Sequence, residues 1–121
     1  MARYVDGYVI PIKKKNVKKY KKMATMGMKT WMKYGALDYY ECIGDKLDVP
    51  YGTSFPKLCK LKKDETVVFA FIVYKSKAHC VQVNKKVHAE FAKMDPKEME
   101  ELFSMKRFST GGFKVLVSNK K

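Results

Sequence analysis

One stretch of this chain restricts its fold more than any other. Residues 67–74 (VVFAFIVY) form an unbroken run of eight apolar side chains rich in β-branched and aromatic types. Such a run is typical of a strand, and it falls far below the roughly 18–20 residues that a helix needs to cross a bilayer. Val67, Phe69, Phe71 and Val73 point to one face of that strand, and the alternate residues point to the other. Both faces are apolar, so the strand must be covered on both sides.

The rest of the chain supplies the elements around this strand. Further strands are predicted over residues 4–12, 37–43 and 108–117, with the third strand itself over 66–74, and Gly111-Gly112 is interpreted as a β-bulge. One helix is expected between an Asn16 cap and Gly35, and a second follows a Ser76 cap. A short helix is expected from the Asp95 cap to Phe103, whereas residues 44–63 contain two prolines and lack periodicity.

This order is βαβ followed by βαβ. It predicts a single α+β domain over residues 1–121, with a ferredoxin-like βαββαβ layout. Both long helices then cover one face of a four-stranded antiparallel sheet, and the chain has no helix left for the other face. The most economical cover is the same face of a second copy, so we expect a homodimer, a dimeric α/β barrel.

Several segments together resemble the YbaA-like family of uncharacterised bacterial proteins, which form a domain of unknown function. The resemblance runs from about Tyr4 to Val117, and its segments are residues 4–11, 35–42, 53–56, 64–69, 73–79, 105–107 and 111–113. It implies a dimeric α/β barrel, in which two ferredoxin-like units pack sheet to sheet. It implies no established activity, although the wider superfamily includes cofactor-free monooxygenases and small-molecule-binding stress proteins.

Three titratable residues are candidates for chemistry. His79 follows the Ser76 cap by three residues, where the helix dipole favours a neutral imidazole that could serve as a general base. Glu41 lies within an aromatic strand and Asp6 within an apolar one, so either carboxylate could exchange protons near neutrality. Each also has a plain structural interpretation, a histidine bonded to its neighbours at a helix start or a carboxylate paired with one of many lysines.

A ligand site follows from the expected topology. The first and third strands are the central pair, and the second helix starts where the third strand ends. We therefore expect Trp31, Tyr74 and His79 to border one cavity near Asp6, with Glu41 as a more distant member. Such a cavity suits a planar ligand that carries an acidic or hydroxyl group.

Metal and cofactor signals are weak. Cys80, Asn84 and His88 fall at four-residue steps on one helix face, but Cys80 also belongs to the apolar stripe, so a core thiol is the favoured interpretation. No cofactor motif is present, because Gly111-Gly112 lacks the third glycine and the following helix of a phosphate loop. The three cysteines fit neither a disulfide framework nor a zinc knuckle, and the first residues do not follow a signal peptide's order, which together favour the cytoplasm.

The charge is strongly basic, at a formal +14. Ten basic residues fall within residues 1–37 against Asp6 alone, and the first helix carries a candidate anion-binding patch of Lys18, Lys22, Lys29 and Lys33. Such a helix could attract nucleic acid or an anionic membrane surface, or it could be a solvated face. Specific RNA recognition is not expected, because the third strand lacks the basic-glycine opening of an RNA-recognition motif.

The sequence thus predicts a small cytoplasmic homodimer that binds a small ligand between sheet and helices, with or without cofactor-free chemistry. Two alternatives stay open: a basic module for nucleic acid or membrane surfaces, and a structural dimer without a ligand.

Overall fold

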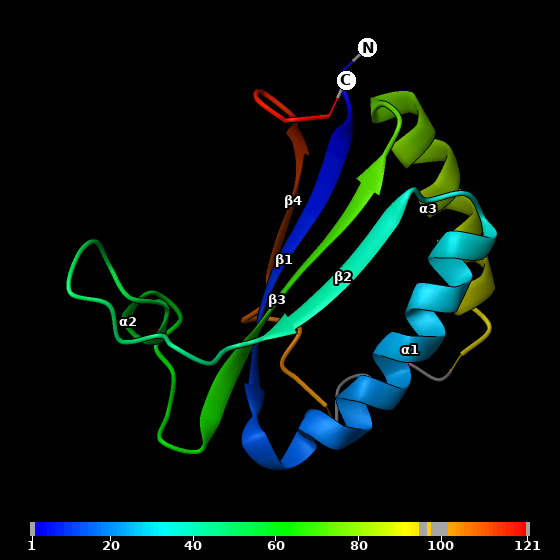
Figure 1. The fold of residues 1–121 in the computed structure, drawn as a ribbon. Coiled ribbons are helices and arrows are strands. Elements are labelled where there is room, and N and C mark those ends of the chain that lie inside the picture. Colours follow the sequence, from blue (N-terminus) through cyan, green and yellow to red (C-terminus); the bar gives the residue numbers. More distant parts are fainter. Residues whose placement is uncertain (1, 95–96, 98–101, 121) are drawn as a thin grey trace.

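Four antiparallel strands form one sheet in the order β2-β3-β1-β4. The computed structural model describes residues 2–94, 97 and 102–120. Along the chain the elements are β1 (Tyr4–Lys13), a 3-10 turn (Lys14–Asn16), α1 (Val17–Lys33), β2 (Asp38–Ile43), α2 (Phe55–Leu58), β3 (Glu65–Tyr74), α3 (Lys77–Phe91) and β4 (Ser109–Lys114). The fold is therefore α+β and ferredoxin-like, with β1 and β3 as the central pair and α1 and α3 on one side of the sheet (Figure 1).

The face of the sheet under the helices forms the core. On β3, the buried side chains of this face are Val68, Ala70, Ile72 and Tyr74, which alternate as the period of a strand requires. They pack against Tyr20 and Ala24 at one end of the sheet and against Cys80, Val83 and Val87 of α3 at the other. The two helices thus account for one apolar face of the central strand.

The opposite face of the sheet is apolar and partly open. Tyr40 on β2, Phe69 on β3 and Phe113 on β4 are 49%, 47% and 61% exposed, and the ring of Phe71 stacks on that of Tyr40 with centroids 5.1 Å apart. The connection that contains α2 lies on this side (Figure 1). It covers only one end of the face, where Leu47 and Phe55 border a hollow of about 80 Å³ together with Val9, Val67 and Phe69.

Two details at β4 correct the sequence prediction. The strand ends at Lys114, opposite Tyr4 at the start of β1, and not at Val117; one further backbone hydrogen bond follows it, from the Val115 N–H to the Arg3 carbonyl at 2.9 Å. Gly111-Gly112 is not a bulge, since the register with β1 runs without interruption from Tyr4 opposite Lys114 to Val9 opposite Ser109. At Gly112 a Cβ atom would meet the far end of the Tyr4 side chain, which crosses the glycine and would have to shift to make room.

The helix starts agree with the prediction in one case and not in the other. The Ser76 hydroxyl accepts the backbone N–H of His79 at 3.1 Å and caps α3 as predicted. Asn16 does not cap α1, because the preceding 3-10 turn leaves it helical, and its side-chain amide donates instead to the Leu102 carbonyl at 3.3 Å. The helix predicted from Asp95 falls largely on residues 95–96 and 98–101, which lie outside the described residues.

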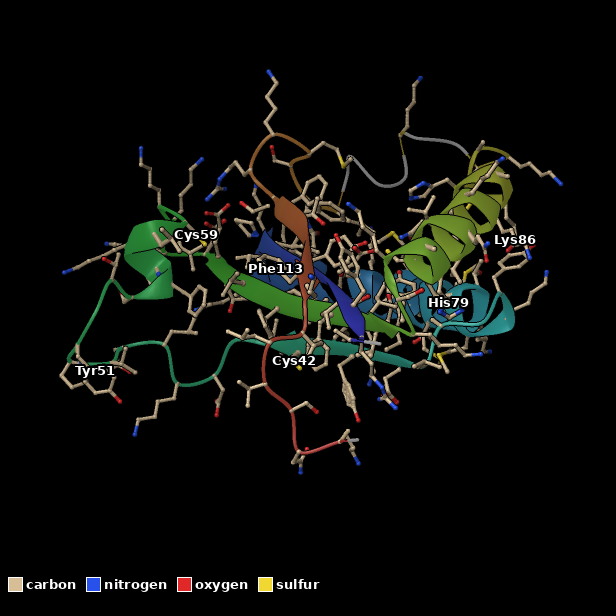
Figure 2. The ribbon with its side chains drawn as sticks, turned by 90° about the horizontal axis from the view of Figure 1, so that it is seen from above. Cys42, Tyr51, Cys59, His79, Lys86 and Phe113 are labelled. Carbon is tan, nitrogen blue, oxygen red and sulfur yellow. The ribbon has the colours of Figure 1, made fainter. Side chains whose placement is uncertain are left out.

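An ion pair holds the connection between β2 and β3 in place. Arg107 donates from Nη1 and Nη2 to the two Glu65 carboxylate oxygens at 2.6 and 3.0 Å, and Nη2 also donates to the carbonyls of Cys59 and Lys60. Figure 2 shows Cys59 and Tyr51 in this connection, well to one side of the sheet and away from α1 and α3. One guanidinium therefore joins the segment before β4, the start of β3 and the end of the connection.

Candidate functional site

A pocket of about 430 Å³ lies between α1 and the edge strand β2, under the N-terminal half of the helix. That size falls in the usual range of ligand pockets. Its walls are mainly apolar, and its polar groups come from two tyrosines, one carboxylate and the helix residues at the mouth. The lining residues are Val17, Tyr20, Lys21, Ala24, Thr25, Met28, Tyr39, Glu41, Cys42, Ile43 and Val68.

Glu41 is the carboxylate of this pocket, and two phenols bind it. The Tyr39 hydroxyl donates to Oε2 at 2.5 Å, and the Tyr20 hydroxyl donates to Oε1. Tyr39 lies on the same face of β2 as Glu41 because the two are two residues apart, and Tyr20 reaches down from the buried stripe of α1.

The phenols around Glu41 stay neutral. Burial raises the pKa of Tyr20 well above its ordinary value, and the negative charge of Glu41 raises it further. Burial and then the hydrogen bond to Glu41 raise the pKa of Tyr39 in the same way. The pocket therefore presents one anionic group held by two neutral donors.

A second polar cluster lies under α3, centred on Asp6 and Asn84. The Asn84 amide donates to Asp6 Oδ2 at 2.8 Å, and the Tyr74 hydroxyl donates to the same oxygen at 3.1 Å. Trp31 Nε1 donates to Asn84 Oδ1 at 3.0 Å, and the Cys80 thiol lies 3.5 Å from both Asp6 oxygens. Asn84 thus links β1, α1 and α3 through one side chain.

The thiol and phenol of this second cluster are protonated. Burial, followed by the charge of Asp6, raises the pKa of Cys80 to about 11 and raises that of Tyr74 well above its ordinary value. A reactive cysteine needs a lowered pKa and access to solvent, and Cys80 has neither, since it is 5% exposed. The cluster is suited to fixing α1 and α3 on the sheet.

The two clusters adjoin each other along the sheet. The rings of Trp31 and Tyr39 lie 5.8 Å apart between centroids, so the indole bonded to Asn84 touches a phenol bonded to Glu41. Tyr8 lies between the two carboxylates, and burial, then the charge of Asp6 and more weakly that of Glu41, raise its pKa. The pocket is therefore backed by a rigid, hydrogen-bonded polar layer.

His79 lies beside this layer without bonding to it. Its Nδ1 accepts the backbone N–H of Lys75 at 3.0 Å, and its ring meets that of Tyr74 edge-on at 6.0 Å. The side chain is half-buried in the first turn of α3 (Figure 2). This is the geometry of a histidine bonded to its neighbours at a helix start, and it does not line the pocket at Glu41.

The predicted site residues thus fall into three places. The structure brings Asp6, Trp31 and Tyr74 together, sets His79 next to Tyr74, and places Glu41 in the separate pocket. Sequence reasoning missed the central part that Asn84 plays. The signal was an amide four residues after Cys80, beside the apolar stripe of the helix, where a polar group covered by the sheet needs partners.

Sequence reasoning also missed Tyr20 as a partner of Glu41. The residue belongs to the buried stripe of α1, and its spacing in the sequence indicates only that it faces the core. Its hydroxyl was the available signal, because a buried phenol usually finds an acceptor.

The basic patch on α1 is exposed. Lys18, Lys22 and Lys29 lie on the solvent side of the helix, but Lys33 makes an ion pair with Glu90 of α3 at 3.0 Å. Lys33 is thus partly neutralised by an exposed ion pair. In the described part of the chain, no helix is long and apolar enough to cross a membrane. Within the same residues, no three His, Cys, Asp or Glu side chains gather where they could hold a metal ion.

Comparison with known proteins identifies the family. A family model described as "Protein of unknown function (DUF1428)" matches residues 3–105. The chain is 33% identical over 121 residues to the uncharacterized protein YbaA of Escherichia coli K12, with 95% of this chain and 97% of that protein covered. The YbaA protein of Shigella flexneri matches with the same identity and coverage.

Two solved structures share the fold. A dimeric ferredoxin-like protein from an uncultured marine organism superposes with a TM-score of 0.63 at 13% identity, covering 98% of this chain and 99% of that one. A Bacillus cereus protein provisionally assigned as an antibiotic biosynthesis monooxygenase gives a TM-score of 0.56 at 10% identity, with both chains fully covered. These likenesses agree with the ferredoxin-like sheet described above. On the family match and the identity to YbaA, the chain belongs to the DUF1428 family.

Proposed function

We propose that this protein binds a small, largely apolar molecule in the pocket between α1 and β2. The main support for the proposal is the pocket of about 430 Å³, in which hydrogen bonds from the Tyr20 and Tyr39 hydroxyls hold the Glu41 carboxylate. Apolar walls with a few fixed polar groups are what a small-molecule site needs, because the walls supply binding energy and the polar groups supply orientation. Each oxygen of Glu41 accepts one phenol and keeps a lone pair for a donor on the ligand.

The active unit in this proposal is a cytoplasmic homodimer of one-domain chains. The described residues form a single sheet, and the face opposite the helices exposes the aromatic rings of Tyr40, Phe69 and Phe113, which a second copy would cover. The marine ferredoxin-like protein of the same fold is described as dimeric. The three free cysteines suit a reducing compartment.

Anion binding by α1 has less support than ligand binding. Lys18, Lys22 and Lys29 are exposed and mutually repulsive, and Lys33 is already paired with Glu90. A basic surface of this kind also arises as a solvated helix face, whereas the pocket has no such plain explanation.

The test is calorimetric titration with 2-naphthylmethanol, an uncharged probe with a flat apolar body and one hydroxyl donor. Thr25→Phe narrows the pocket from α1 without touching the core, because Thr25 is exposed at the mouth. The matched control is Thr53→Phe, the same change at an exposed position in the distant connection. We expect Thr25→Phe to weaken binding by at least roughly tenfold and Thr53→Phe to leave it unchanged. Equal affinity in all three proteins, or no binding to the wild type, would contradict the proposal.

A further inference from the structure

The charge balance of the pocket is unusual for so basic a protein. The chain carries 26 Lys and Arg residues. In the part of the chain that the structure describes, the two ion pairs are Lys33–Glu90 and Arg107–Glu65, and no cation pairs with Glu41. The carboxylate that faces the pocket is instead held by two neutral phenols. Its negative charge is therefore left without a counter-ion.

From this we infer that the pocket selects an organic cation, an amine with an apolar body whose ammonium group meets Glu41. The inference rests on the proposed function and adds the chemical class of the ligand. An ammonium donates to the free lone pairs of the carboxylate, and charge-assisted hydrogen bonds of this kind are stronger than neutral ones.

Two features of the molecule oppose a cation, and solvent weakens the effect of both. Lys21 lines the pocket from α1, but it is exposed, so water screens its charge. The formal charge of +14 repels cations from the whole surface, but that field decays over a Debye length of about 8 Å at physiological ionic strength. A contact with Glu41 inside the pocket is short and partly shielded from salt, so the local attraction prevails over the diffuse repulsion.

The experiment compares three probes that share one bicyclic body and differ in charge. These are 2-naphthylmethylamine as the cation, 2-naphthylmethanol as the neutral form and 2-naphthoate as the anion, each titrated calorimetrically at pH 7. We expect the wild type to bind the amine at least roughly tenfold more tightly than the alcohol and to bind the naphthoate least tightly. This ranking needs no variant, so it stands even if a substitution harms folding.

Glu41→Gln then assigns the preference to one residue. It keeps an acceptor oxygen for one phenol, sets an amide NH₂ beside the other and removes the charge, so the amine and the alcohol should bind within about threefold of each other. Asp45→Asn is the matched control, since it removes one exposed carboxylate just beyond β2 and should keep the wild-type ranking.

Different results would contradict the cation inference and the proposed function. Equal binding of all three probes to the wild type, or tightest binding of naphthoate through Lys21, would overturn the cation inference and leave the pocket as a ligand site. A preference for the amine that survives Glu41→Gln would overturn the inference as well. Failure of both the alcohol and the amine to bind would remove the proposed function together with the inference.

Discussion

The Glu65–Arg107 pair makes a prediction whose size follows from the geometry. Arg107 binds both carboxylate oxygens of Glu65, and the backbone N–H of Lys62 donates to Oε1 at 2.8 Å. The Glu65 side chain is 6% exposed and that of Arg107 is 31% exposed. The hydrogen bonds from Arg107 and from the Lys62 backbone hold the pKa of Glu65 at about 2, compared with an ordinary value of 4.5.

The perturbation is Glu65→Gln, which keeps the shape and removes the charge. A fall of the pKa from 4.5 to about 2 corresponds to about 3 kcal/mol if the site were dry. Because the Arg107 side chain is partly exposed, water screens the ion pair and reduces its contribution to stability. We therefore expect Glu65→Gln to lower the free energy of unfolding by about 1 to 2 kcal/mol at pH 7.

The pH dependence has a definite sign. The folded-state pKa of Glu65 lies below the unfolded value, so its stabilising effect is complete above pH 4.5 and is lost as the pH falls toward 2. The difference between wild type and Glu65→Gln should therefore be constant from pH 7 to about 5 and then shrink steadily.

Urea unfolding at a series of pH values measures this difference, with the fluorescence of Trp31, the single tryptophan, as the signal. The protein concentration is held fixed, since the stability of a dimer depends on it. Glu90→Gln is the control, because its ion pair with Lys33 is exposed and its loss should matter little. A wild-type advantage below about 0.5 kcal/mol at pH 7, or one that does not change with pH, would refute the reasoning.

Three further predictions concern the sheet face, the second polar cluster and the basic helix. Light scattering at micromolar concentration should give the wild type a mass of twice that of its 14.0 kDa chain. The Phe69→Lys variant should aggregate or dissociate, because dimerisation through this face would bury the lysine charge. A stable wild-type monomer would contradict the predicted dimer. Asn84→Asp should lower the free energy of unfolding by about 1 to 3 kcal/mol at pH 7, measured with urea, because it sets a second carboxylate beside Asp6. This loss of stability should shrink on acidification as the pair of carboxylates takes up a proton. An unchanged urea midpoint would show that Asn84 does not stabilise the packing of α3 on the sheet. In salt-gradient retention on DNA or anionic vesicles, any wild-type affinity should be independent of base sequence and should vanish at physiological salt. Changing Lys18, Lys22 and Lys29 to Glu should abolish this affinity, while Lys33 is kept as the partner of Glu90. Base-specific binding at physiological salt would instead favour nucleic-acid binding over small-molecule binding as the function.

The fold could be predicted from the sequence because its strongest signals are local. The apolar run of β3, the Ser76 cap and the left-handed Gly35 after α1 each act through neighbouring residues. The end of β4 could not be predicted, because residues 115–117 have strand composition and the limit comes from where β1 begins. The same holds for the contact at Gly112, because the ring that crosses this glycine comes from Tyr4 on another strand.

The candidate site could be predicted only in part, because it depends on side chains far apart in the chain. Asp6, Trp31 and Tyr74 could be grouped from topology, since the order of strands and helices places them at one end of the sheet. Their link through Asn84, and the hydrogen bond from Tyr20 to Glu41, depend on the rotamers of side chains that meet between the helices and the sheet. Periodicity marks Tyr20 as buried but does not say what its hydroxyl binds.

The central claim is that the pocket beside Glu41 binds small molecules, and methionine methyl NMR with 2-naphthylmethanol tests it most directly. Met28 lines the pocket, whereas Met26 and Met32 lie on the same helix, 59% and 41% exposed. With ¹³C-labelled methionine methyl groups, addition of the probe should shift the Met28 signal in a saturable way and leave those of Met26 and Met32 in place. A saturable shift at Met26 or Met32 without one at Met28, or no shift at any of the three, would contradict the account.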